Sequence, residues 1–346
     1  NLVSLREHAE VLSEKLGREV AFIDDVAGPA ARAAIQALGD GDILLLDNLR
    51  FLTEEVSTFE SAVKLTPAEM TGTYLVRNLA PLVDVYVNDA FAAAHRNAPS
   101  MVAFQELLPT AGGRLLIDEV TALSGLASDP DRPCVFVLGG LKISDAFSMM
   151  EKVLADGAAD RILTTGITAN VMLIAQGIDL GEPTAAFITD RSLDVFVPRA
   201  SELLRVYGDR IEVPTDLAYD DEGERREVAV ADLPIDALLI DVGSETIAAY
   251  EEVIAGAATL FVNGPAGVYE SEAGEYGTRS LWEAVAASDG YSVIGGGDTV
   301  ASARRFVDPD DIGFISTGGG ALIRFLSGQP LPLIDAMEGA TERNPS

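Results

Sequence analysis

Residues 135–145 read VFVLGGLKISD, and this stretch decides the fold class. Its first four residues are apolar and rich in valine, which is typical of a strand buried in a parallel sheet. Two glycines follow, as a tight turn requires, and a helical spacing of apolar residues begins at Asp145. A strand that runs through a glycine turn into a helix is the repeating unit of an α/β domain.

The same alternation of short apolar runs and helical segments extends along the chain. The runs predict buried parallel strands at residues 20–22, 43–46, 83–87, 135–138, 161–163, 237–240, 259–262, 291–294 and 313–316. Between them, segments rich in Ala, Leu and Glu predict helices at residues 6–16, 28–38, 113–125, 145–156, 244–256 and 279–287. This order predicts an α/β fold built on parallel sheets.

Length and composition set the broad class. The chain has 346 residues, 48% of them hydrophobic, which predicts two domains. No apolar run approaches the roughly 20 residues that a membrane helix needs, and no basic, apolar leader opens the chain. Cys134 is the single cysteine, which excludes an internal disulfide and a cysteine-based zinc site. We therefore expect a cytoplasmic protein with no membrane partner.

The charge balance is strongly acidic. Asp and Glu total 55 against 24 Lys and Arg, a net charge of −31, and the acids are dispersed along the chain. Self-repulsion of this size weakens a compact state in dilute salt, and salt screens it. We expect a protein from the high-salt cytoplasm of an extreme halophile; an ordinary acidic protein is the alternative. The chain offers no basic stripe, so nucleic acid is not an expected partner.

Glycine-rich segments follow several predicted strands. They read NGPAG at residues 263–267, GGGDT at 295–299 and STGGG at 316–320. Glycine at the carboxyl end of a parallel strand lets the backbone approach a ligand, and the amides of the next helix point at an anion. These loops predict a phosphate site. The alternative is that the glycines only form tight turns between strands and helices.

The lysines support the phosphate interpretation. Only four occur, Lys15, Lys64, Lys142 and Lys152, and Lys142 directly follows a strand and its glycine turn. A phosphoryl group in transfer is stabilised by a positive side chain at such a position. Neither the P-loop motif nor G-x-G-x-x-G occurs, so the phosphates are not held by either familiar loop, and a NAD-dependent dehydrogenase is disfavoured.

Seven ordered motifs resemble those of the phosphoglycerate kinase family. They are LLLDNLRF (44–51), DVYVNDAFAAAHR (84–96), VLGGLKISD (137–145), DVGSET (241–246), NGPAGVYE (263–270), IGGGDTVA (294–301) and ISTGGGA (315–321). The resemblance implies two Rossmann-like, doubly wound domains joined by a hinge, the first binding a triose and the second a nucleotide. It implies reversible phosphoryl transfer between 1,3-bisphosphoglycerate and MgADP, giving 3-phosphoglycerate and MgATP. We expect a monomer.

The resemblance also implies roles for single residues. Arg50 and Arg96 match the family's triose-phosphate arginines, with His95 supporting Arg96. On the nucleotide side, the matching positions are Gly139, Gly140, Lys142, Asn263, Glu270, Gly295, Gly296, Gly297, Asp298, Thr299, Gly318, Gly319 and Gly320. The reacting phosphoryl group would contact Lys142, Gly296, Gly319 and Arg50. Asp298 would bind Mg²⁺ as a hard oxygen ligand, and a helix N-cap is its structural alternative.

Some positions depart from the family pattern. Ala146 stands where many members have a second lysine, and the adenine loop reads TTGI at residues 164–167. The family's opening D-x-N-x-P and S-H-L-G-R-P motifs are absent, so we expect a fragment with an incomplete first domain. A non-catalytic nucleotide-binding fragment is therefore the alternative function.

The motifs and the proline-rich linker suggest the domain limits. We expect a partial triose domain at residues 1–125, a hinge at 126–132 and a nucleotide domain at 133–321. The last segment, 322–346, is expected to return to the first domain.

Overall fold

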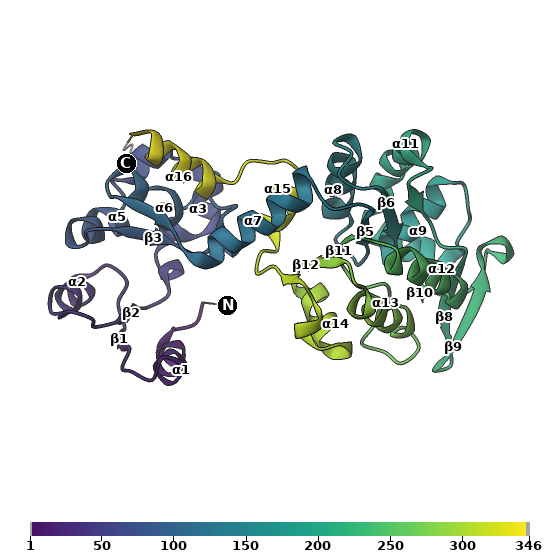
Figure 1. Cartoon of the computed structure of the whole chain (residues 1–346), viewed down its shortest axis with the longest axis horizontal. Helices are drawn as coiled ribbons and strands as arrows, with labels where there is room; N and C mark the ends of the chain where they lie inside the picture. The colour runs from purple at the N-terminus through teal and green to yellow at the C-terminus, as the bar shows by residue number, and fades with distance from the viewer. Residues whose placement is uncertain (1, 344–346) are drawn as a thin grey trace. The chain divides into compact units, whose positions relative to one another are not determined.

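The computed structural model describes residues 2–343, which form two compact units (Figure 1). Unit 1 comprises Asn1–Ile117 and Pro330–Ser346, and unit 2 comprises Asp118–Gln329. The division falls inside helix α7 (Arg114–Ser128), upstream of the residues 126–132 that the sequence suggests as a hinge. None of the described helices is long and apolar enough to cross a membrane.

Unit 2 is built on one parallel sheet. The strand order is β13-β12-β11-β5-β6-β7, and every neighbouring pair is parallel. The strands are β5 (Cys134–Leu138), β6 (Arg161–Thr164), β7 (Ile211–Glu212), β11 (Thr259–Asn263), β12 (Tyr291–Ile294) and β13 (Phe314–Ile315). After β5 the chain adds β6 and β7 on one side of this strand, and it then adds β11, β12 and β13 on the other side. All six carboxyl ends therefore meet at one edge, with the change of direction between β5 and β11.

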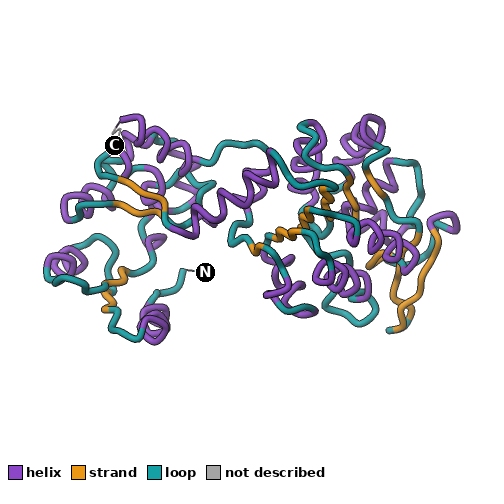
Figure 2. Tube along the Cα trace, viewed as in Figure 1, coloured by secondary structure: helices purple, strands orange, loops and turns teal. Residues whose placement is uncertain are grey.

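Helices cover both faces of this sheet (Figure 2). They are α8 (Ile143–Ala155), α9 (Gly166–Ala175), α10 (Glu182–Asp190), α11 (Val197–Tyr207), α12 (Ser244–Ala255), α13 (Tyr276–Ala287), α14 (Gly297–Phe306) and α15 (Gly320–Leu326). In one group α8 contacts α9, α11 and α15, and in another α13 contacts α12 and α14. The strand and helix predictions for residues 135–163 and 244–294 are confirmed to within a few residues at each end.

A smaller antiparallel sheet corrects one strand prediction. Residues 237–240 were expected to join the parallel sheet, but β10 (Leu239–Val242) pairs antiparallel with β8 (Asp216–Asp221). Strand β8 turns back into β9 (Glu224–Ala229) through Glu222 and Gly223, which both have positive φ, at 54° and 91°. This geometry suits a two-residue hairpin turn. The sequence did not reveal the hairpin, because its strands are too polar to show an apolar run.

Unit 1 contains two pairs of parallel strands. Strand β1 (Ala21–Ile23) pairs with β2 (Leu44–Leu46), and β3 (Tyr86–Asn88) pairs with β4 (Thr110–Gly112), which the sequence did not predict. Its helices are α1 (Arg6–Leu16), α2 (Pro29–Gln36), α3 (Ser57–Val63), α4 (Pro67–Met70), α5 (Tyr74–Leu79), α6 (Pro99–Val102) and α16 (Pro332–Arg343). Helix α16 contacts α6 and β4, and the Leu333 amide donates to the Ala94 carbonyl at 3.2 Å. The chain returns to this unit at Pro330, since residues 322–329 belong to unit 2.

Candidate functional site

Two loops at the carboxyl edge of the unit 2 sheet pack backbone against backbone. The amides of Gly139 and Gly140, after β5, donate to the carbonyls of Asn263, the last residue of β11, and of Pro265 in the loop that follows, both at 2.9 Å. A Cβ on Gly264, whose φ is +89°, would lie 2.3 Å from the Gly139 carbonyl oxygen. Only glycine fits there, so the glycines bring the two strand ends into direct contact.

Lys142 stands at this edge. It is the N-cap residue of α8, its side chain is exposed, and it enters no ion pair among the residues that the structure describes. Lys152, by contrast, pairs with Asp156 at 2.7 Å on the same helix. The ammonium group of Lys142 is therefore available to an anion.

The loop after β12 is tied to the loop after β11. Asn263 donates to the Gly295 carbonyl at 2.6 Å, and the hydroxyl of the buried Thr299 accepts from the Gly264 amide at 2.8 Å. Gly296 is the N-cap of α14. Asp298 is the second residue of this helix, and its side chain is exposed. The N-cap alternative for Asp298 is therefore wrong. Its carboxylate makes no hydrogen bond among the described residues and suits the positive end of the helix.

The loop after β13 depends on a residue that the sequence did not single out. Glu119, in α7, is fully buried and accepts from the Ser316 hydroxyl at 2.7 Å and from the Thr317 amide at 2.6 Å. The Ser316 hydroxyl in turn accepts from the Gly318 amide at 3.0 Å. This network holds the segment that precedes Gly319, the N-cap of α15, and Gly320, its first residue. The sequence does not predict this contact, because an acidic residue is common in a helix and nothing in the neighbouring residues marks it as buried.

A cavity of about 520 Å³ opens beside these loops. Gly140, Pro265, Glu270 and Asp298 are among its lining residues, so three of the sequence-predicted segments, 137–145, 263–270 and 294–301, border one space. The wall is otherwise largely apolar, with Leu141, Ile167, Phe187, Leu217, Leu238, Leu239, Ile240, Val242 and Val268. A largely apolar cavity with a few polar groups next to glycine loops suits a ligand with a flat apolar part and an anionic part.

A buried ion pair supports the wall of the cavity. Arg225 of β9 donates to the Asp241 carboxylate at 2.8 Å and to the Val242 carbonyl at 2.7 Å. Burial raises the pKa of Asp241 to about 6, against the opposing effects of the Gly277 amide and Arg225. The motif containing Asp241 was recognised in the sequence, but its partner was not, because Arg225 lies in the unpredicted hairpin.

The sequence-predicted triose residues lie in unit 1. Arg96 donates to the Glu60 carboxylate at 3.2 Å and to the Glu55 carbonyl at 3.1 Å, so its guanidinium group is held in place. His95 precedes it in the chain and is half-buried. Arg50 lies in the short 3-10 helix Leu49–Phe51 with an exposed side chain and no ion pair among the described residues. This helix contacts the next one, Thr53–Glu55, whose last carbonyl binds Arg96.

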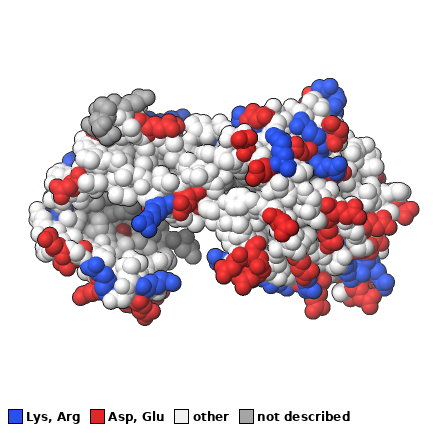
Figure 3. Space-filling model, in the orientation of Figure 1, with Lys and Arg blue, Asp and Glu red and all other residues white. Residues whose placement is uncertain are grey.

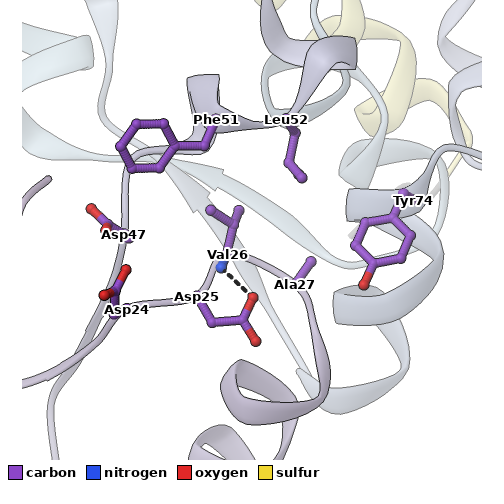
Figure 4. Close-up of a pocket in the computed structure, with 8 residues that line it drawn as sticks. All are labelled: Asp24, Asp25, Val26, Ala27, Asp47, Phe51, Leu52 and Tyr74. Carbon is purple, nitrogen blue, oxygen red and sulfur yellow. Dashed lines mark hydrogen bonds between the residues drawn. The ribbon is translucent and has the colours of Figure 1, made fainter. Parts of the chain in front are cut away.

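A smaller pocket in unit 1 is acidic (Figure 4). It has a volume of about 200 Å³ and is lined by Asp24, Asp25, Asp47 and the apolar Phe51, Leu52, Val26 and Ala27 with Tyr74. The Asp24 and Asp47 side chains lie next to each other in Figure 4. Three carboxylates disfavour an anion, so this pocket is not itself a phosphate site.

Comparisons with known proteins identify the family in which this arrangement occurs. A sequence model of the family described as "Phosphoglycerate kinase" matches residues 1–329, which reach across both units. The chain belongs to the phosphoglycerate kinase family. The protein is accordingly an enzyme, a kinase of glycolysis, and the dehydrogenase alternative is excluded.

Individual phosphoglycerate kinases are similar over nearly the whole chain. That of Methanothermus fervidus is 42% identical over 344 residues, which cover 99% of this chain and 82% of the relative. That of Methanothermobacter thermautotrophicus is 43% identical over 338 residues, covering 98% of this chain and 80% of the relative.

Solved structures of phosphoglycerate kinases have a similar fold. The phosphoglycerate kinase of Pyrococcus horikoshii OT3 superimposes with a TM-score of 0.89 at 37% identity, covering 99% of this chain and 84% of that one. The structure from Coxiella burnetii gives a TM-score of 0.79 at 32% identity, covering 98% of this chain and 81% of that one. The predicted α/β class with parallel sheets is therefore confirmed.

Proposed function

We propose that this phosphoglycerate kinase transfers a phosphoryl group reversibly between 1,3-bisphosphoglycerate and MgADP, giving 3-phosphoglycerate and MgATP. The observation that carries the proposal is the edge of the unit 2 sheet. There the loops after β5, β11 and β12 are hydrogen-bonded to one another, and beside them stands Lys142, which enters no ion pair with a described residue.

The nucleotide would occupy the large cavity of unit 2. Its base and ribose suit the apolar wall, with Glu270 accepting ribose hydroxyls, and its phosphates suit the glycine edge. The backbone amides after β12 and β13, at residues 295–297, 319 and 320, would bind phosphate oxygens at helix N-termini, whereas the Gly318 amide donates to the Ser316 hydroxyl and would shape the loop. Asn263 and Thr299 bond neighbouring loops and so would hold these amides in place.

Asp298 is the residue that we assign to Mg²⁺. Mg²⁺ bound to a nucleotide needs one or two carboxylates, and the described residues contain no cluster of metal-binding side chains that would suggest a separate ion. The carboxylate of Asp298 is exposed, accepts no hydrogen bond from the residues that the structure describes and lies beside the phosphate loop, which fits this role. When bound, the ion neutralises charge on the phosphates.

The transfer itself would rely on positioning and positive charge. Lys142 would bind the phosphoryl group in transfer, together with the amides of Gly296 and Gly319. The attacking carboxylate or phosphate oxygen is already ionised, so no general base is needed.

Arg50 and Arg96 would bind the triose, since guanidinium groups suit phosphate and carboxylate. The Glu60 contact pre-orients Arg96, and His95 would support it. Because the two substrates bind to different units, transfer requires a hinge motion that brings them into line. Arg50 would then reach the phosphoryl group in transfer.

We also propose a monomeric, cytoplasmic protein from a high-salt cell. Its net charge is −31, and Figure 3 shows Asp and Glu at many separate places on the visible face. Salt would therefore stabilise the folded state by screening repulsion between surface carboxylates.

The test is a coupled assay of 3-phosphoglycerate phosphorylation by MgATP in molar KCl, alongside calorimetric titration with MgADP. We expect turnover and MgADP binding on the same sample. Binding of MgADP without turnover at every salt concentration would instead select the alternative, a non-catalytic nucleotide-binding fragment.

A further inference from the structure

Arg225 joins the β8–β9 hairpin to two of the segments that line the large cavity. Its side chain is 17% exposed, and every nitrogen of its guanidinium group donates a hydrogen bond. At the end of β10 it binds the Asp241 carboxylate and the Val242 carbonyl. It also donates to the Ala273 carbonyl and to the Glu227 carboxylate, both at 3.0 Å. One side chain thus holds three separate stretches of the chain together.

The contact with Ala273 reaches the segment that carries Glu270. This segment, residues 267–275, lines the cavity as far as Glu270 and then leads into α13. Directly after Glu270 it forms a turn in which the Gly274 amide donates to the Ser271 carbonyl at 3.2 Å. Ala273 lies inside this turn, so a bond that fixes its carbonyl restricts the positions that Glu270 can take.

The Asp241 carboxylate fixes the beginning of the same segment. Its side chain is fully buried, and besides Arg225 it accepts from the Gly277 amide at 2.7 Å. A Cβ added to Gly267 would overlap this carboxylate, so the backbone of the segment packs directly on Asp241. A buried carboxylate without its cation is strongly unfavourable, so the place of Asp241 depends on Arg225. Arg225 therefore holds the segment at Gly267 through Asp241, and at Ala273 directly.

We propose that Arg225 is a positioning residue that holds Glu270 at the cavity and so sets how well the enzyme recognises the ribose of the nucleotide. The inference rests on the proposed nucleotide role of the cavity and of Glu270, and it adds the residue on which that role depends. Arg225 is not among the lining residues of the cavity. It acts through the segment that it holds, without touching the nucleotide.

The experiment compares MgADP with the Mg²⁺ complex of dideoxyadenosine diphosphate, which lacks both ribose hydroxyls. Titration calorimetry on the full chain in molar KCl is run for the wild type, Arg225→Lys and the control Arg226→Lys. Lysine at position 225 keeps a charge opposite Asp241, but it lacks the planar fork that reaches the Val242 and Ala273 carbonyls together. Arg226 is the next residue of β9, with a side chain that is 54% exposed.

The wild type and the control should bind MgADP roughly tenfold more tightly than the dideoxy analogue, the size expected for a hydrogen bond to a charged group. Arg225→Lys should bind the two ligands to within about threefold of each other, with its loss confined to MgADP. A purely structural role would weaken the binding of both ligands equally and would overturn the inference. A wild type that binds both ligands equally would overturn it too.

Glu270→Ala tests whether Arg225 acts through Glu270. This variant should lose the preference for MgADP, and adding Arg225→Lys should remove nothing more, because two changes to one interaction are not additive. Additive losses would contradict the inference. Should Arg225→Lys fail to fold, the double change Arg225→Met and Asp241→Asn removes both charges of the pair, and the same comparison applies. Failure of the wild type to bind either nucleotide would contradict the proposed function as well, which separates the two.

Discussion

The buried carboxylate of Glu119 accepts two hydrogen bonds from Thr317, which lies 198 residues later in the chain. The Thr317 amide donates at 2.6 Å and its hydroxyl at 2.8 Å, both to the same carboxylate oxygen. The other oxygen accepts from Ser316 at 2.7 Å. One carboxylate thus connects α7 to the segment that leads into α15, so the proposed phosphate loop is held by a residue outside the nucleotide motifs.

We expect Glu119→Ala to lower the free energy of unfolding by about 3 kcal/mol, because buried donors on Ser316 and Thr317 lose a charged acceptor. Glu119→Gln should cost less, since the amide oxygen can still accept from Thr317. Urea unfolding in molar KCl measures both. Asp118→Asn, an exposed change at the neighbouring position, is the control. Equal stability of the Ala and control variants would show that the network contributes nothing.

Lys142 allows a direct test of the transfer step. Lys142→Met keeps most of the side-chain length but removes the charge, and kcat should fall by at least about a hundredfold, as for loss of one electrostatic group aimed at the transition state. The KM for 3-phosphoglycerate should change little. The control is Lys15→Met, an exposed lysine in α1. A kcat close to that of the wild type would show that Lys142 does not contribute to the transfer step.

Gly264 tests the backbone contact at the sheet edge. We expect Gly264→Ala to destabilise the protein by about 3 kcal/mol, because the residue has positive φ and its new Cβ would overlap the Gly139 carbonyl. Gly125→Ala, in α7, has no atom within 4 Å of the added Cβ and should be neutral or slightly stabilising. Thermal unfolding of both variants in the same buffer makes the comparison. Similar melting temperatures would mean that the two loops can separate at little cost.

Asp25 makes part of the stability of unit 1 depend on pH. Burial opposes its ionisation, but hydrogen bonds from the Ala31, Gly28 and Val26 amides outweigh burial and lower the pKa of Asp25 from 3.8. A lowered folded-state pKa stabilises the fold above pH 3.8, and this stabilisation is lost as the pH falls through the folded-state pKa.

We therefore expect Asp25→Asn to cost about 1 kcal/mol near neutral pH, as for loss of a capping carboxylate at the start of α2. The difference from the wild type should shrink below pH 3.8. Urea unfolding at matched salt and several pH values measures it. A difference that stays constant through the acid range would contradict the assignment of the stabilisation to the ionised carboxylate.

Much of unit 2 was predictable from the sequence because its signals are local. The run of residues 135–138, its glycines and the helix that follows are adjacent in the chain, and they form β5, its turn and α8 as expected. The hairpin of β8 and β9 was missed, because its stability comes from pairing with each other and with β10 rather than from an apolar run. Strand β4 was missed because its three residues, Thr-Ala-Gly, have little strand preference of their own.

The sequence by itself determined the alternation of strands and helices, the glycine loops and the resemblance to phosphoglycerate kinases, because each of these depends on residues that are close together in the chain. The tertiary structure alone decided which distant side chains meet. It joined Glu119 to Thr317, paired Arg225 with Asp241, and brought the loops after β5 and β11 into contact. Such contacts depend on how strands and helices pack, and packing brings together residues whose separation along the chain carries no signal of their proximity.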